Sequence, residues 1–262
     1  MEIPVQAWYE AIFRRRSYRK FKKIMLDVDK LGQLSSVCDN FRPFPEARSV
    51  LVREPAGQVY RGFLGLYGKI ENAPVYVAFI GNMDSPRVQE AVGYTGQGII
   101  LEATGLELGT CWVGGFFYPE EVELQIPIAK NERVLAITPV GIPHDSFSFK
   151  EKLMTGFGYF HRRKQLSELM TGSPKKEWMK TALEAARLAP SAVNRQPWRF
   201  LLGDNTISVK LNKGRDTYKI ARRLDCGIAM LHLELGARYS GVDGKWTFPP
   251  DSIACFVADS SL

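Results

Sequence analysis

The sequence contains little cysteine and histidine. Its 262 residues include four cysteines and three histidines. Cys38, Cys111, Cys226 and Cys255 lie far apart, and no two of them have Cys-x-x-Cys spacing, which argues against a structural zinc site and a thioredoxin-like redox pair. The His-Glu-x-x-His motif of zinc proteases is also missing. We therefore expect no metal site.

Long apolar runs are missing as well. No stretch approaches the roughly 20 residues that a membrane-spanning helix needs. The start, Met1-Glu2-Ile3-Pro4, has no basic region followed by an apolar core, as a secretory signal would have. We expect a cytoplasmic protein with reduced thiols and no membrane partner. Hydrophobic residues make up 45% and charged residues 24%, which is typical of a globular protein. This composition excludes a chain that is mostly disordered or mostly coiled coil.

Positive charge is concentrated in two places. The net charge is +7, and seven of the ten residues 14–23 are basic, while Arg162, Arg163 and Lys164 form a second cluster. Such runs are often solvated helix ends. They also suit a phosphate-bearing ligand, because arginine matches phosphate oxygens with paired donors. Nucleic acid is a third option, but no interleaved aromatic pattern or DNA-reading motif accompanies the charge, so we expect no nucleic-acid partner.

Apolar spacing predicts a mixture of helices and strands. Helices are expected at 4–15, 31–41, 86–104, 226–237, and from the Ser173-Pro174 start signal to Pro190; strands are expected at 49–53, 75–80, 110–116, 132–139, 198–202, 207–211, 245–248 and 253–258. Because they do not alternate strictly, the class is predicted as α+β. Glycines inside the 86–104 helix require close approach of another helix or a ligand, since each costs about 1 kcal/mol relative to alanine.

The element order contains a weak repeat. Residues 1–172 have the order helix, helix, strands, long helix, strands, and residues 173–262 have the order helix, strands, long helix, strands. No fixed period accompanies it, so the repeat is at most an old duplication. The linker would lie near residues 170–174.

Three segments carry candidate chemistry. They are residues 15–21 (RRSYRKF), 105–116 (GLELGTCWVGGF) and 189–200 (APSAVNRQPWRF). Each alone is also compatible with a structural role: a solvated charge run, a strand edge after a helix, and a turn into a strand.

Taken together, these segments resemble the FMN-dependent nitroreductase family. That family has Arg-Arg-Ser-x-Arg-x-Phe near its N-terminus, Ala-Pro-Ser-x-x-Asn-x-Gln-Pro-Trp-x-Phe, Gly-Leu-Gly-x-x-Trp-x-Gly-Gly after a long helix, and a closing Arg-Lys-x-Leu-x-Glu-Leu, which matches residues 163–169 here. The order departs from the family, because the Pro-Ser-x-x-Asn segment comes last. Residues 36–44 hold a weak echo of it at the family's usual place.

The family's architecture explains this departure. Its members are domain-swapped homodimers with FMN at the interface, and one subunit supplies the Pro-Ser-x-x-Asn segment to a site built by the other. The resemblance therefore implies a nitroreductase-like three-layer fold present as two fused, diverged copies, 1–172 and 173–262. This intramolecular pseudo-dimer would be a monomer or a homodimer and would keep a single FMN site.

The resemblance also implies roles for individual residues. Four side chains would hold the phosphate: Arg15, Ser17, Arg163 and Lys164. Arg16 and Arg19 lie on the same loop, with Arg19 near the pyrimidine edge of the flavin, where a cation stabilises the reduced form.

The remaining site residues would surround the flavin ring. The backbones of Gly114 and Gly115 would approach N5 and O4, which a Cβ would obstruct. Trp112 and Val113 precede them in the same cofactor-binding segment, and we expect Trp112 to pack and take no part in the chemistry. The segment from the second half would wrap the flavin with Pro190, Ser191 and Asn194.

The implied function is an FMN-dependent oxidoreductase. NAD(P)H would give hydride to FMN, which would pass it to a small-molecule acceptor such as a nitroaromatic, a quinone or an activated alkene. No acid–base side chain is required, so no catalytic side chain is predicted. One alternative is a flavin binder without turnover, used for storage or sensing; others are a nucleic-acid binder and the flavin-degrading chemistry of a side branch of the family.

Overall fold

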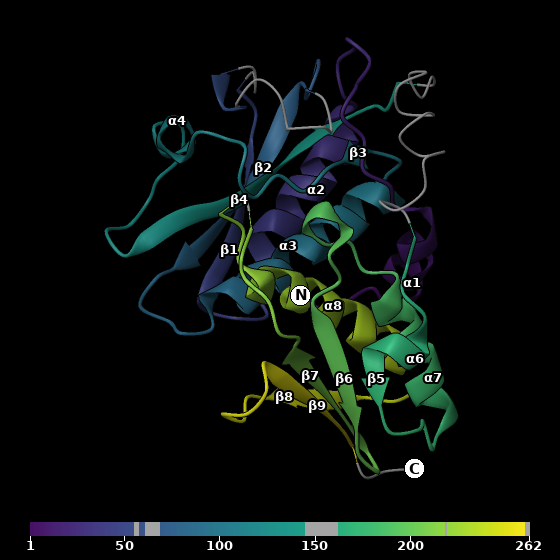
Figure 1. Cartoon of the computed structure of the whole chain (residues 1–262). Coiled ribbons are helices and arrows are strands. Elements are labelled where there is room, and N and C mark those ends of the chain that lie inside the picture. Colours follow the sequence, from purple (N-terminus) through teal and green to yellow (C-terminus); the bar gives the residue numbers. More distant parts are fainter. Residues whose placement is uncertain (55–57, 61–68, 145–161, 218, 260–262) are drawn as a thin grey trace.

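The computed structural model describes residues 1–54, 58–60, 69–144, 162–217 and 219–259. It has two β-sheets, one at the upper left and one at the bottom of Figure 1, with helices between them. The class is α+β, as predicted. None of the helices in these ranges has the length and apolar character to cross a membrane.

The first sheet is antiparallel and has the strand order β1-β2-β4-β3. Its strands are β1 (Ala47–Val52), β2 (Val75–Asn82), β3 (Gly109–Thr110) and β4 (Glu132–Gly141). Strand β2 is buried along nearly its whole length. Its side chains alternate between two apolar clusters, with Val77 and Phe79 in one and Tyr76 and Ala78 in the other. An apolar run without polar alternation is what a strand covered on both faces requires.

The second sheet has the order β5-β6-β7-β9-β8. Its strands are β5 (Met170–Thr171), β6 (Trp198–Leu202), β7 (Thr206–Leu211), β8 (Gly244–Thr247) and β9 (Ala254–Ala258). The antiparallel part, β6-β7-β9-β8, has the same chain-order pattern as the first sheet. Strand β5 is added outside it, parallel to β6, with Met170 opposite Phe200. Residues that precede position 172 therefore complete the sheet formed by the end of the chain.

The helices lie between the two sheets or beside them, and the short helix near the upper left of Figure 1 lies on the outer side of the first sheet. The helices are α1 (Val5–Arg14), α2 (Val28–Asn40), α3 (Val88–Gly105), α4 (Pro119–Glu123), α6 (Leu166–Leu169), α7 (Glu177–Arg187) and α8 (Arg222–Tyr239), with a 3-10 turn η3 (Ala192–Asn194). Helices α3 and α8 pack against each other at the centre and are buried on almost every side. They connect the two sheets into one core.

Close packing explains the glycines of α3. A Cβ on Gly93 would lie 2.0 Å from the Leu224 carbonyl oxygen, so only glycine allows α8 to approach. At Gly96 it would meet Trp112 at 2.5 Å, and at Gly98 it would meet Phe41 at 2.4 Å. The prediction of close approach by another helix is confirmed at Gly93, whereas Gly96 and Gly98 meet aromatic rings, which the prediction did not name.

Most predicted elements are confirmed to within a few residues, and two are not. The strand expected at 110–116 is reduced to β3 and one isolated bridge between Val113 and Ile137. The helix start at Ser173 is wrong, because α7 begins at Glu177. Gly172 leaves β5 with a φ of +94°, and residues 173–176 connect that turn to the helix.

Candidate flavin-phosphate site and the turn that completes it

The Arg-Arg-Ser segment runs beside β3. It begins where α1 ends, with Arg15 as the helix C-cap. Ser17 forms a parallel bridge with Thr110, and the Tyr18 N–H donates to the Thr110 carbonyl at 2.8 Å. This pairing fixes the segment next to the chain that leads to Gly114. Arg15, Ser17 and Arg19 are half-buried, whereas Arg16 is exposed.

The positive charge of Arg163 acts on the guanidinium of Arg15. The pKa of Arg15 is lowered to about 10, mainly by burial and next by the positive charge of Arg163. Burial and Arg187 lower the pKa of Arg163, and burial and Arg199 lower that of Lys164. Within the described part of the chain, neither Arg15 nor Arg163 is paired with a carboxylate. Two half-buried, uncompensated cations form a site that favours an anion such as phosphate.

The basic residues 162–164 form hydrogen bonds with the Pro-Ser-x-x-Asn turn. The Arg163 guanidinium donates to Asn194 Oδ1 at 2.5 Å and to the Leu188 carbonyl at 3.2 Å, which are both neutral acceptors. The Lys164 N–H donates to Gln196 Oε1 at 2.8 Å, and Asn194 Nδ2 donates to the Arg162 carbonyl at 3.0 Å. Two of the segments singled out in the sequence are thus brought together.

The turn itself is held in an unusual conformation. Val193, Asn194 and Gln196 have φ values of 47°, 55° and 47°. This region is uncommon for residues other than glycine, and a β-branched valine there is a true outlier. Each such residue costs about 1–3 kcal/mol and persists where the surroundings hold it, often at ligand clamps. Here Ser191 Oγ accepts from the Gln196 N–H and the Ser191 carbonyl accepts from the Asn194 N–H, both at 3.0 Å. Pro190 is buried beneath them.

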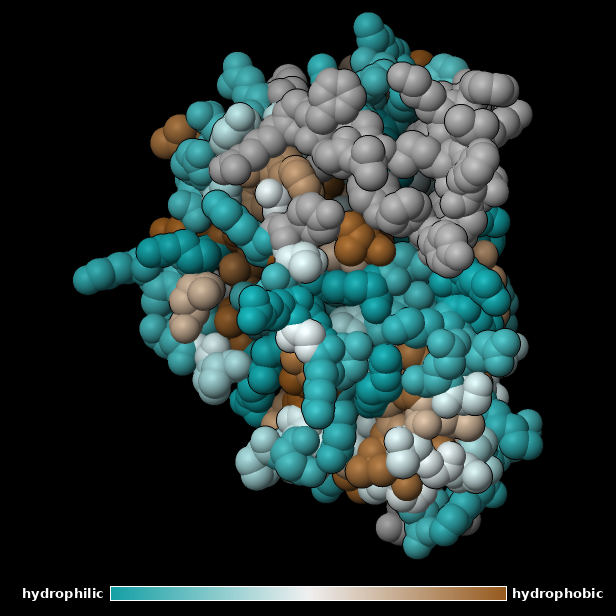
Figure 2. Space-filling view, viewed as in Figure 1, coloured by the Kyte–Doolittle hydropathy of each residue, from teal (hydrophilic) through white to brown (hydrophobic). Residues whose placement is uncertain are grey.

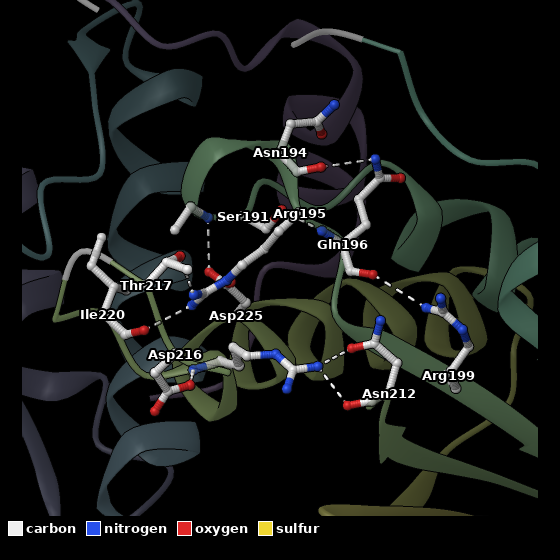
Figure 3. Close-up of polar contacts among 12 residues, drawn as sticks. Ser191, Asn194, Arg195, Gln196, Arg199, Asn212, Asp216, Thr217, Ile220 and Asp225 are labelled. Atoms are coloured by element: carbon white, nitrogen blue, oxygen red, sulfur yellow. Dashed lines mark hydrogen bonds and ion pairs between the residues drawn. The ribbon is translucent and has the colours of Figure 1, made fainter. Parts of the chain in front are cut away.

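A buried ion pair ties this turn to the start of α8 (Figure 3). Asp225 is 1% exposed; its carboxylate accepts from the Ala192 N–H at 3.0 Å and from Arg195 Nε at 2.6 Å. Burial raises the pKa of Asp225 to about 6, and Arg195 opposes that rise. The same guanidinium donates to the Ile220 carbonyl at 3.1 Å and to Thr217 Oγ1 at 3.3 Å. Arg195 therefore connects the turn with the loop before α8.

The Gly-Gly segment meets that loop. Val113 is buried, and its N–H and carbonyl both pair with Ile137 at 2.9 Å, which fixes the chain just before Gly114. Gly114 and Gly115 are half-buried. A Cβ on Gly114 would lie 3.3 Å from two carbons of the Ile220 side chain. The first part of the chain and the loop before α8 are thus in contact at this glycine.

Trp112 belongs to a buried chain of hydrogen bonds. Its Nε1 donates to Gln97 Oε1 at 2.9 Å, the Gln97 amide and His232 Nε2 are 2.8 Å apart, and His232 Nδ1 lies 3.0 Å from the Ala185 carbonyl. Because a carbonyl only accepts, the ring proton is assigned to Nδ1, and Nε2 accepts from Gln97. The Trp112 ring also packs on Phe79, with centroids 4.7 Å apart. This geometry agrees with the packing role predicted for Trp112.

His232 is held neutral. It is fully buried, and burial lowers its pKa to about 3, with the charges of Arg15 and Arg163 acting in the same direction. These hydrogen bonds from Trp112 to Ala185 therefore link α3, α8 and α7, near enough to Arg15 and Arg163 for both charges to act on His232.

Sequence reasoning missed several residues of this region. Gln97, Ile220, Asp225 and His232 were not singled out. Gln97 and His232 are isolated polar residues inside apolar helical stretches, and that contrast is a usable signal. Asp225 and Ile220 carry no local signal, because their partners lie elsewhere in the sequence.

The face drawn in Figure 2 is mainly hydrophilic across its middle, between the regions of the two sheets. Among the residues that the structure describes, no group of three or more histidine, cysteine or acidic side chains could hold a metal ion.

Comparison with solved structures identifies the fold. A putative nitroreductase from Thermotoga maritima is 18% identical and superimposes with a TM-score of 0.65, covering 95% of this chain and 93% of that one. A nitroreductase family protein from Clostridium novyi is 23% identical over 55% of this chain and 87% of its own, with a TM-score of 0.44. A nitroreductase with bound FMN from Bacteroides fragilis is 15% identical over 53% and 89%, also with a TM-score of 0.44. No curated protein matches the chain.

A family model gives the assignment. The model described as "Putative TM nitroreductase" matches residues 7–237. This range includes the cationic pair, the Gly-Gly segment and the strained turn. The chain belongs to this nitroreductase family.

Proposed function

We propose that the chain is an FMN-dependent oxidoreductase that passes hydride from NAD(P)H to a nitroaromatic, a quinone or a similar acceptor. The observation that carries the proposal is the pair Arg15 and Arg163, two cations without a carboxylate partner among the described residues, which the fold assembles from distant segments beside a strained turn. Family membership supports the same reading.

The residues present fit FMN. Arg15, Ser17, Arg163 and Lys164 would hold its phosphate, since arginine and lysine are charge-assisted donors to phosphate oxygens. Exposed Arg16 would contribute at longer range, and Arg19 would face the pyrimidine edge. This edge gains negative charge on reduction, so a cation there raises the reduction potential.

The flavin ring would lie between the two halves of the chain. Trp112, Val113, Gly114 and Gly115 would border it on one side, and Pro190, Ser191 and Asn194 would wrap it on the other. When bound, FMN would supply the chemistry of hydride acceptance and donation at N5. The chain's own contribution is to bind, orient and tune this group: glycine backbone without Cβ leaves room near N5, and neutral His232 keeps Trp112 and Gln97 in one arrangement.

We further propose that residues 1–172 and 173–262 are diverged copies of one unit. The shared strand pattern β1-β2-β4-β3 and β6-β7-β9-β8 supports this, as does the addition of β5 to the second sheet. In such a pseudo-dimer, the cationic segments and the Pro-Ser-x-x-Asn turn belong to different copies. A single complete set of segments then provides one site per chain.

The test is a flavin titration followed by anaerobic reduction. The purified protein should bind FMN, and NADH or NADPH should bleach its visible absorption, which a quinone or nitroaromatic should restore with turnover. Bleaching by neither nucleotide would favour a flavin-binding role without turnover. Absence of FMN binding would overturn the proposal. A variant with Arg15→Ala and Arg163→Ala, compared with exposed Arg14→Ala, tests whether the cationic pair is the site.

A further inference from the structure

Ile220, in the loop before α8, packs against Gly114 of the first part of the chain. Two carbons of its side chain lie 3.3 Å from where a Cβ of Gly114 would stand. Both residues are half-buried. Among the described residues, Ile220 supplies the three atoms nearest to that position. The side chain that packs on Gly114 therefore comes from the loop before α8.

This loop is fixed at the end that carries Ile220. The Ile220 N–H donates to the Thr217 carbonyl at 3.0 Å. Arg195 donates to both of these residues, to the Ile220 carbonyl at 3.1 Å and to Thr217 Oγ1 at 3.3 Å. Asp225 in turn orients Arg195 through Nε at 2.6 Å. The next residue, Ala221, is the N-cap of α8, so the helix start limits movement from the other side.

The chemistry of this position suits discrimination by size. Ile220 presents a branched aliphatic group with no hydrogen-bonding atom, and such a wall acts on a ligand through shape alone. One methylene more or less in an apolar pocket changes binding by about 1–3 kcal/mol. Because β-branched side chains have few rotamers, isoleucine is a stiff wall.

We propose that Ile220 is a specificity-determining residue, which limits the size of an aromatic ligand that can lie beside Gly114, and that Arg195 is its positioning residue. The proposal rests on the proposed function, because it takes the backbone of Gly114 to lie at the flavin. The Arg195–Asp225 pair then has a second role besides holding the Pro-Ser-x-x-Asn turn, because it fixes the position of Ile220.

Ligand binding without turnover tests this. The oxidised, FMN-saturated protein is titrated with two redox-inert amides, benzamide with one ring and 2-naphthamide with two fused rings, by the change in flavin absorption. Ile220→Ala should improve 2-naphthamide binding relative to benzamide by about tenfold. Ile220→Phe should shift the ratio the other way. The matched control is Leu201→Ala, an aliphatic side chain 40% exposed on β6, which should leave the ratio unchanged.

Arg195→Lys tests the positioning role. Lysine keeps the positive charge beside Asp225 but lacks the fork that reaches Thr217 and Ile220 together. The ligand ratio should move in the direction of Ile220→Ala by a smaller amount. A thermal shift alone, with no change in the ratio, would show that Arg195 only stabilises the fold and would overturn its positioning role.

The outcomes separate the two proposals. If the parent protein binds no FMN, the proposed function fails. If the parent binds FMN and is bleached by NAD(P)H, but the ratio is the same in Ile220→Ala and Leu201→Ala, the function stands and the specificity role of Ile220 is wrong.

Discussion

Gly93 of α3 and Gly227 of α8 each face the backbone carbonyl of the residue three positions before the other. A Cβ on Gly93 would lie 2.0 Å from the Leu224 oxygen, and a Cβ on Gly227 would lie 2.0 Å from the Glu90 oxygen. The two glycines also occupy the same position counted from the start of their helices. The relation is reciprocal, as the contact between two symmetric subunits would be. It therefore supports the proposal of two diverged copies in one chain.

The helix contact predicts a large effect of a single methyl group. Gly93→Ala should lower the free energy of unfolding by about 1–3 kcal/mol, because the Cβ would strike backbone, which cannot move aside as a side chain can. Urea unfolding provides the measurement. The control is Gly32→Ala in α2, where an added Cβ meets nothing within 4 Å and where alanine should stabilise the helix by up to about 1 kcal/mol. Equal stability of the two variants would contradict the packing argument.

Phosphate binding predicts a difference between neighbouring arginines. Arg15→Ala should weaken FMN binding about tenfold or more, since a hydrogen bond to a charged group contributes roughly 1.5–3 kcal/mol. Flavin fluorescence titration measures the dissociation constant. Arg14→Ala, at an exposed position one residue earlier, should have little effect. Riboflavin lacks the phosphate and should bind the parent and Arg15→Ala almost equally; a parallel loss of riboflavin binding would point to a damaged fold.

The Gly-Gly segment predicts loss of reactivity on adding a side chain. Gly114→Val should displace Ile220 and crowd the flavin, so reduction of bound FMN by NAD(P)H should slow markedly. Stopped-flow absorption of the FMN-loaded variant gives the rate. Gly105→Val is the control, because an added Cβ there meets nothing within 4 Å. Normal reduction in a folded, FMN-loaded Gly114→Val variant would remove this segment from the site.

Buried His232 predicts a dependence of stability on pH. Its pKa is about 3 in the folded chain and 6.5 ordinarily, so between these values the unfolded chain binds a proton that the folded chain does not. Stability therefore falls as pH decreases below about 6.5, by roughly 1.4 kcal/mol per pH unit from this group. Urea unfolding at several pH values should show the slope in the parent. In His232→Gln this pH dependence of the free energy of unfolding should be smaller. If the curves of the two proteins were parallel, His232 would not be the cause of the pH dependence.

The split arrangement predicts one FMN per chain. Arg15, Gly114 and Arg163 precede the proposed boundary at residue 172, while Ser191 and Asn194 follow it. Titration should saturate near one flavin per chain, and residues 1–172 and 173–262 expressed separately should each bind weakly. Each piece would also expose an apolar helix face and be poorly soluble. Two flavins per chain, or tight binding by 1–172 alone, would refute the fused pseudo-dimer.

The sequence by itself determined the elements and the local motifs. The apolar run of β2 and the spacing of α1 are properties of a few consecutive residues, so their structure follows from periodicity. The turn at 189–196 is also predicted from its own residues, because proline, serine and asparagine act on the backbone of their immediate neighbours. Predictions failed where residues distant in the sequence determine the structure. Ser173 is a good local signal for a helix start, but α7 begins only at Glu177, after Thr171 of β5 has paired with β6.

The tertiary structure alone decided which of these segments meet. The charge of Arg163 acts on Arg15, Gln97 bonds His232, and Ile220 covers Gly114, and in each case more than 100 residues separate the partners. Such pairs have no signal in the local sequence, because the contact depends on how α3 packs on α8 and not on the residues adjacent to either partner. The two glycines at that packing surface let α3 and α8 approach closely, and this packing joins the two parts of the chain that carry these segments.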